Sequence, residues 1–162
     1  MPVLHDDTLR VAEILLETEQ PGSAARRRAA STAYYSAFQS LSALCALCLS
    51  RAKPSSEAYL RAYRALEHRQ VRDLLSRGTD FKAFLSAPFA QLQNIRQWAD
   101  YNVSTHPDET DVQAGRRFTI DEARASVGMA RKAIEFVDSP RSACSTAPGG
   151  AAARSRPALI PL

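Results

Sequence analysis

The feature that most constrains the fold of this chain is the uninterrupted run from Ser23 to Ser50, SAARRRAASTAYYSAFQSLSALCALCLS. It contains no Pro or Gly, and it is rich in Ala and Leu, two of the strongest helix formers. Its apolar residues recur at steps of three and four, which places them on one face of an α-helix; they are Ala30, Tyr34, Ala37, Phe38, Leu41, Leu44, Cys45 and Cys48. At about 1.5 Å per residue, such a helix spans roughly 40 Å. We therefore expect one long central helix on which the rest of the chain packs.

Four further segments show the same helical spacing of apolar residues. We predict helices at 6–19, from Ser55 or Ser56 to Arg77, at 88–103 after a short turn at 81–87, and at 121–138. Gln20-Pro21-Gly22 is too short a connection for anything but a hairpin, so the first two helices should be antiparallel. The predicted fold class is therefore all-α, an up-and-down bundle of four to five helices that occupies residues 1–138.

The composition changes after residue 138 to Pro, Gly, Ala, Ser and Arg. Such a segment cannot bury enough apolar surface to offset the entropy lost on ordering, so we predict that 139–162 is a disordered basic tail. The tail holds Arg141, Arg154 and Arg156 and no acidic residue, while the whole chain has a net charge of +4. The difference, 4 − 3, leaves about +1 on the bundle. The charge is therefore weak support for a general nucleic-acid surface.

The cysteines and the N-terminal residues indicate the cellular compartment in which the protein is expected. No apolar stretch approaches the roughly 20 residues of a membrane span, and MPVLHDDTLR lacks the basic and apolar regions of a signal peptide. The three cysteines cannot all pair within one chain, and Cys45 and Cys48 lie on the apolar stripe. A CxxC zinc or redox motif is the alternative, but no second ligand pair is nearby and the cysteines lie near the helix C-terminus. We expect free thiols in the core, a cytoplasmic protein, no membrane contact, no metal and no cofactor.

Two other groups of charged residues have ordinary interpretations. Arg26, Arg27 and Arg28 crowd positive charge at the N-terminus of the central helix, against its macrodipole. We interpret them as a solvated helix end, with a phosphate contact as the alternative. His68 and His106 have no orienting partner that the sequence can identify, so we interpret both as exposed or partly buried histidines without a catalytic role.

The most unusual local string is NIRQWADYN, residues 94–102. Arg96 and Asp100 are four residues apart, so a helix places them on the same face, where they can pair. The plain interpretation is a surface ion pair. The functional one is a site for phosphate or a base edge, because a cation, a carboxylate, a phenol and an amide meet near a helix end. The hydroxyl of Tyr35, beside the apolar stripe, can reach a polar partner at a helix interface. The candidate binding residues are Arg96, Asp100, Tyr101, Asn102 and Tyr35.

Two short motifs carry a resemblance to a known family. ASTAYYSAF at 30–38, followed some 60 residues later by RQWADY at 96–101, resembles the HEPN family of small prokaryotic helical proteins. The resemblance implies a four- or five-helix bundle, frequently a homodimer, often encoded with a nucleotidyltransferase partner in toxin-antitoxin or defence systems. Many members of that family are metal-independent ribonucleases.

The nuclease members of that family carry an Arg-x(4–6)-His motif on a late helix. Arg96 matches the arginine, but Tyr101, Asn102 and Val103 occupy the histidine positions, and His106 lies ten residues after Arg96. An Arg, Asp and Tyr set lacks a group that titrates near neutral pH. Whether the protein is an enzyme is therefore left open by the sequence.

Three hypotheses follow. The first is a non-catalytic HEPN-like module that dimerises and binds a partner protein, a nucleotide or RNA through Arg96, Asp100 and Tyr101. The second is a metal-independent HEPN ribonuclease toxin in which His68 or His106 folds back towards Arg96. The third is a structural subunit whose basic tail binds nucleic acid without specificity, with an affinity that falls steeply with salt.

Overall fold

The computed structural model describes residues 4–77, 85–101, 112–113 and 116–139. Its helices are α1 (Leu4–Ile14), α2 (Ser23–Ser50), α3 (Glu57–Ala65), α4 (His68–Arg77), α6 (Ala87–Tyr101) and α7 (Ile120–Asp138). Between α6 and α7, β1 (Val112–Gln113) and β2 (Arg116–Arg117) form a two-residue antiparallel ladder, with Val112 opposite Arg117. The predicted all-α class is confirmed. The described residues contain six helices, however, where four to five were predicted.

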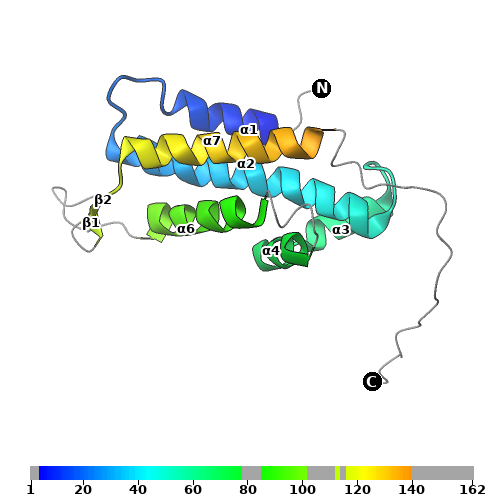
Figure 1. Cartoon of the computed structure of the whole chain (residues 1–162). Helices are drawn as coiled ribbons and strands as arrows, with labels where there is room; N and C mark the ends of the chain where they lie inside the picture. Colours follow the sequence, from blue (N-terminus) through cyan, green and yellow to red (C-terminus); the bar gives the residue numbers. More distant parts are fainter. Residues whose placement is uncertain (1–3, 78–84, 102–111, 114–115, 140–162) are drawn as a thin grey trace.

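The helix α2 is the central element, as the sequence predicts. Among the described helices it contacts each of the other five. Figure 1 shows α1, α2, α6 and α7 side by side along one direction, with α1 and α6 running opposite to α2 and α7. The predicted antiparallel hairpin of α1 and α2 is part of this arrangement. The short helices α3 and α4 lie beside the C-terminal end of α2 (Figure 1).

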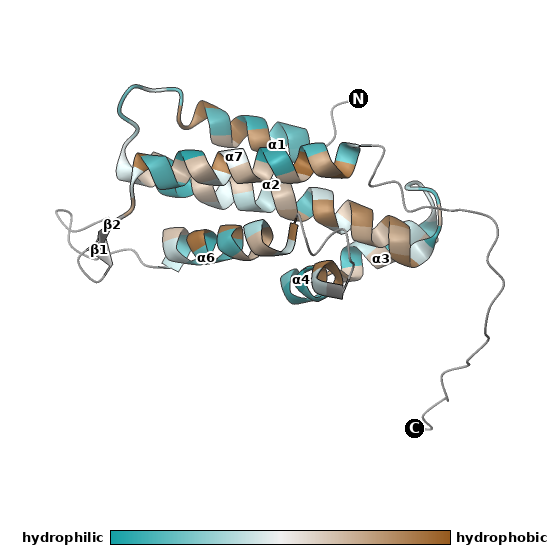
Figure 2. Cartoon of the chain, in the orientation of Figure 1, coloured by the Kyte–Doolittle hydropathy of each residue, from teal (hydrophilic) through white to brown (hydrophobic). Residues whose placement is uncertain are grey.

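The buried surface of α2 is wider than the predicted stripe. Most of the stripe is buried, but Phe38 and Cys48 are partly exposed, and small residues outside the stripe are covered as well. These additional buried residues are Ala29, Ser31, Ala33, Ser36, Ser40, Ser42 and Ala46. Neighbouring helices cover α2 on several sides, and the small side chains allow them to approach closely. Apolar residues continue to the C-terminal end of α2, where Leu47 and Leu49 are exposed (Figure 2).

The prediction of one helix from residue 55 or 56 to Arg77 is wrong, because the chain breaks between α3 and α4. Leu66 is extended, with φ −76° and ψ 120°, and a new helix starts at His68. The apolar spacing explains the break. The partly buried Tyr59, Tyr63 and Leu66 follow steps of four and three, but Val71, which is fully buried, comes five residues after Leu66. A continuous helix would turn Val71 well away from that face. The break lets Val71 be fully buried.

The last two helices begin close to their predicted positions. Pro88 is the second residue of α6, where its missing N–H removes no helical hydrogen bond. Thr119 caps α7 through a capping box: its hydroxyl accepts from the Glu122 N–H at 3.2 Å, and the Glu122 carboxylate accepts from the Thr119 N–H at 2.9 Å. The predicted turn at 81–87 falls largely outside the described residues, and so does the predicted disordered tail from 140 onward.

Candidate functional site

The predicted pairing of Arg96 with Asp100 is present in the structure. One turn of α6 separates them, and Arg96 Nε lies 2.7 Å from Asp100 Oδ2. The two side chains are only 17% and 24% exposed. This ion pair is therefore partly shielded from solvent, unlike the surface pair of the plain interpretation.

Contacts to α2 extend the pair into a network between two helices. The Arg96 Nη2 group donates a hydrogen bond to the Tyr35 hydroxyl at 2.6 Å. The Ser31 hydroxyl donates to Asp100 Oδ2 at 3.1 Å. Tyr35 thus has the polar partner at a helix interface that the sequence predicts but does not identify. The network joins α2 to α6, and it compensates the charge of Arg96 with that of Asp100.

Aromatic rings surround the Arg96 guanidinium. Its central carbon lies 5.4 Å from the ring centroid of Tyr35 and 5.1 Å from that of Tyr101. Both distances are within cation–π range. Tyr101 is the last residue of α6 and is 70% exposed. The cation therefore holds an exposed tyrosine ring at the surface, next to a polar network that is mostly covered.

His68 lies in the same region, next to Tyr34 and Tyr35, as the ribonuclease hypothesis requires of either His68 or His106. His68 Nδ1 lies 2.7 Å from the hydroxyl of Tyr34, and its ring packs 4.2 Å from Phe38 and 6.0 Å from Tyr35, centroid to centroid. The break before α4 puts His68 at a helix start that faces α2. His68 and Arg96 therefore share Tyr35 as a neighbour, although they come from different helices.

The surroundings shift the pKa values of Tyr34 and His68 in opposite directions. Burial raises the pKa of the Tyr34 phenol well above its ordinary value, so the phenol keeps its proton at neutral pH. Burial, and then the charge of Arg96, lower the pKa of His68. The imidazole is then neutral near pH 7, and its Nδ1 shares one hydrogen bond with the Tyr34 hydroxyl, in which the tautomer of the ring decides which group donates.

Arg27 corrects the interpretation of the arginine cluster as a solvated helix end. It is 6% exposed, and its Nη1 donates to the carbonyl oxygens of Trp98 at 3.2 Å and Ala99 at 3.1 Å. The guanidinium carbon also lies 5.8 Å from the ring centroid of Phe118. The last carbonyls of a helix lack intrahelical partners and carry partial negative charge, so a buried cation stabilises them. Arg27 therefore anchors the end of α6 that carries the candidate site.

The spacing of the sequence already contained a signal for the burial of Arg27. Arg27, Ala30, Tyr34 and Ala37 follow steps of three, four and three, so Arg27 lies in phase with the buried stripe. Arg28, which is out of phase, is exposed as the solvated interpretation expects.

Two candidate residues are not placed. Asn102 and His106 lie outside the described residues, so the predicted amide and one of the two histidines of the ribonuclease hypothesis are not located.

The cysteines only partly match the prediction of free thiols. Cys45 is free and buried, and burial raises its pKa to about 11, which makes it an unreactive core residue. Cys48, in contrast, is disulfide-bonded. Cys48 therefore does not support the expectation of free thiols in a reducing compartment, and Cys45 alone of these two does.

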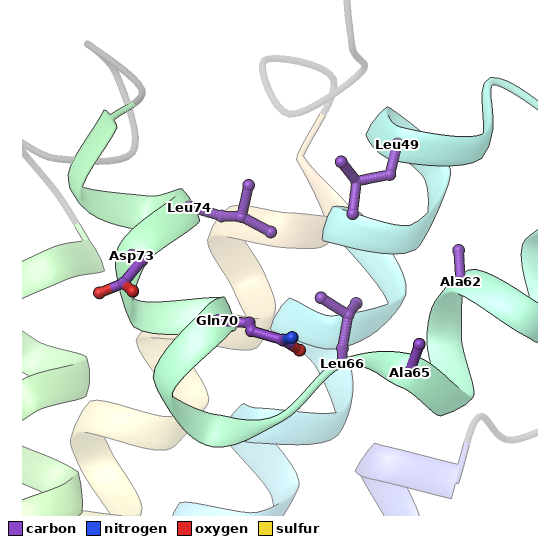
Figure 3. A pocket seen from close by; sticks show the side chains of 7 residues that line it. All are labelled: Leu49, Ala62, Ala65, Leu66, Gln70, Asp73 and Leu74. Carbon is purple, nitrogen blue, oxygen red and sulfur yellow. The ribbon is translucent and has the colours of Figure 1, made fainter. Parts of the chain in front are cut away.

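A groove of about 340 Å³ lies elsewhere, between the end of α2 and the two short helices. Its lining residues are Leu49, Ala62, Ala65, Leu66, Gln70, Asp73 and Leu74. In Figure 3, the side chains of Leu49, Leu66 and Leu74 surround a common space. None of the predicted site residues lines this groove.

Comparisons with protein-family models, with curated proteins and with solved structures found no match for this chain. The resemblance to the HEPN family therefore stays an expectation from the two sequence motifs. Within the described part of the chain, no helix combines the length and the apolar character that crossing a bilayer requires. The structure thus defines a helical protein with a partly covered arginine–tyrosine–histidine cluster between α2, α4 and α6.

Proposed function

We propose that the protein is a non-catalytic, HEPN-like helical module that binds single-stranded RNA at the surface formed by Tyr35, Arg96 and Tyr101. The observation that carries the proposal is the exposed ring of Tyr101, held 5.1 Å from the Arg96 guanidinium at the end of α6. An exposed aromatic ring beside a cation is a platform on which an unpaired base can stack.

The charge of the cluster favours stacking over a phosphate clamp. Asp100 lies 2.7 Å from Arg96 and compensates its charge, so little attraction is left for a phosphate. The imidazole of His68 is neutral, and the Tyr35 hydroxyl already accepts from Arg96. These groups suit hydrogen bonds to a base edge or a ribose hydroxyl. We therefore expect modest affinity with a shallow salt dependence.

A direct test measures the binding of a fluorescent single-stranded RNA to wild type and to Tyr101→Ala. Stacking contributes about 1–3 kcal/mol per base, so the variant should bind about 5- to 150-fold more weakly. Tyr59→Ala is the matched control, since Tyr59 stacks on Tyr63 within α3 and not in this site. Equal affinities for wild type and Tyr101→Ala would refute the proposed surface.

A full-length variant in which Arg141, Arg154 and Arg156 become Ser separates the tail hypothesis from this one. If the tail carries the binding, this variant loses affinity and most of the salt dependence, while Tyr101→Ala binds like wild type. If Tyr101 carries the binding, Tyr101→Ala loses affinity and the tail variant binds like wild type.

A second candidate function is the metal-independent ribonuclease, and the position of His68 favours it specifically. A neutral imidazole can act as a general base towards a ribose hydroxyl, and Arg96 can stabilise developing negative charge. Against it, the Tyr34 hydroxyl occupies Nδ1 of His68 at 2.7 Å. Incubation with cellular RNA tests it: cleavage by wild type that His68→Gln and Arg96→Lys both abolish would replace the binding proposal with this one.

The proposal includes a homodimer and a nucleotidyltransferase partner, both from the family resemblance alone. Sedimentation of the purified chain should give about twice its mass of 17.8 kDa. A monomer at all concentrations would remove the dimer from the proposal and leave the RNA surface to be judged by its own test.

A further inference from the structure

Three potential metal ligands meet where α1 begins and α7 ends. His5, Asp6 and Asp138 each offer one ligand atom, and these atoms all lie within 4.8 Å of one another. Figure 1 shows the start of α1 beside the end of α7. The sequence analysis expects no metal, because it finds no second ligand pair near the CxxC motif. Asp138 becomes its neighbour only through the packing of α1 and α7.

The imidazole of His5 is buried, and its Nε2 makes no hydrogen bond to the part of the chain that the structure describes. The side chain is 7% exposed, and among the described residues Nε2 has no hydrogen-bond partner. Asp6 Oδ1 lies 3.6 Å from it, beyond a hydrogen bond. That separation matches two ligands on one tetrahedral ion, which are about 3.4 Å apart when each bond is about 2.1 Å. A buried nitrogen without a hydrogen bond is costly unless another group satisfies it.

A contact with α2 fixes the backbone of His5. The hydroxyl of Ser36, fully buried on α2, donates to the backbone carbonyl of His5 at 2.6 Å. The first turn of α1 is therefore tied to the central helix. The carboxylates of Asp6 and Asp138, in contrast, are exposed, so an ion can reach the group from solvent and the carboxylates can rotate to meet it.

The charge around this group is negative, which favours the binding of a cation. Asp138 is the last residue of α7, where the helix macrodipole already places partial negative charge, and the last turn of α7 contains no basic residue. Asp6 adds a second carboxylate beside it. One imidazole and two carboxylates form a ligand set that borderline divalent ions such as Zn²⁺ accept.

We propose that His5, Asp6 and Asp138 bind one divalent cation of the zinc class, and that this ion joins the start of α1 to the end of α7. Three protein ligands leave at least one coordination position for water. The ion would link two helices that are far apart in the sequence. This site shares no residue with the Arg96 cluster.

The test is a titration of full-length, tag-free protein with Zn²⁺ against a chromophoric chelator. Wild type should bind one equivalent, and Asp138→Asn and His5→Gln should each bind at least tenfold more weakly. Asp7→Asn is the matched control, because it removes the same charge from the same turn without touching the group. Since Asp138 is exposed, its variant should fold normally. Zinc should also raise the melting temperature of wild type and Asp7→Asn, but not that of Asp138→Asn.

Two results would overturn the proposal. One is the absence of saturable zinc binding by wild type, which would leave His5 as a histidine paired only with carboxylates. The other is equal zinc affinity in wild type and Asp138→Asn. Titration with Co²⁺ adds a check on the ligand set: a thiolate charge-transfer band would place the metal on a cysteine and reject the site.

Discussion

Replacement of Arg27 by Ala should destabilise the protein strongly. The change removes two hydrogen bonds from a cation to the carbonyl oxygens of Trp98 and Ala99, and a contact with the Phe118 ring. A hydrogen bond that involves a charged group contributes about 1.5–3 kcal/mol, and a desolvated cation–π contact about 1–2 kcal/mol. The variant also recovers part of the cost of burying a guanidinium, several kcal/mol for an isolated ion. We expect a net loss of about 2–4 kcal/mol in the free energy of unfolding.

Urea denaturation followed by circular dichroism measures this loss. With a slope of about 2 kcal/mol per molar urea, the unfolding midpoint should fall by about 1–2 M. Arg28→Ala is the matched control, since it removes an equal charge one residue away from an exposed position. It should change the stability by no more than about 0.5 kcal/mol. If the two variants lost the same amount, the assignment of Arg27 as the anchor of α6 would be refuted.

Three further outcomes are expected. The folded state holds His68 neutral, because burial and then the charge of Arg96 lower its pKa from 6.5; stability should therefore be full above that pH and decline as the pH falls through it. Denaturation at a series of pH values should show a shallower decline for His68→Gln, and parallel curves would contradict the assignment. Gly128→Ala should add about 1 kcal/mol, because an added Cβ meets nothing within 4 Å, and a lower melting temperature would disprove it. Thr119→Ala should lose about 1 kcal/mol through its N-cap while Thr119→Ser should not; equal losses would mean that the capping box contributes little.

The parts of the fold that depend on local chemistry were predictable. The spacing and composition of 23–50 predict α2 to the residue, and Pro88 and Thr119 mark helix starts because their effects on the backbone are local. The break between α3 and α4 was missed, although the five-residue step from Leu66 to Val71 signals it. Strong helix formers stand on both sides of this step, so local propensity favours one continuous helix. The chain breaks because the apolar faces before and after the step must both pack on α2.

In the candidate site, contacts within one helix could be predicted from the sequence, and contacts between helices could not. The Arg96–Asp100 pair spans one turn of a single helix, so it could be predicted from spacing. The contacts of Ser31 with Asp100 and of Tyr34 with His68 join residues about 70 and 34 positions apart, and they depend on how α2, α4 and α6 pack. The spacing of α2 signals the burial of Arg27 but not its partners, because these are the backbone carbonyl groups of Trp98 and Ala99, which no side-chain pattern reveals. The roles assigned to these residues in binding stay predictions.

The place of α7 at the end of the described chain has a consequence for biosynthesis. The hairpin of α1 and α2 leaves the ribosome early, and its contacts are close in sequence. Ala130, Ala133 and Ile134 of α7 are buried in the main core, and α7 packs on both α1 and α2. During translation, the side of α2 that these residues cover stays open until the last helix has been made. The nascent chain therefore exposes that surface to aggregation until α7 docks, even when α1, α3, α4 and α6 have already packed on α2, and a chaperone can shield it in the meantime.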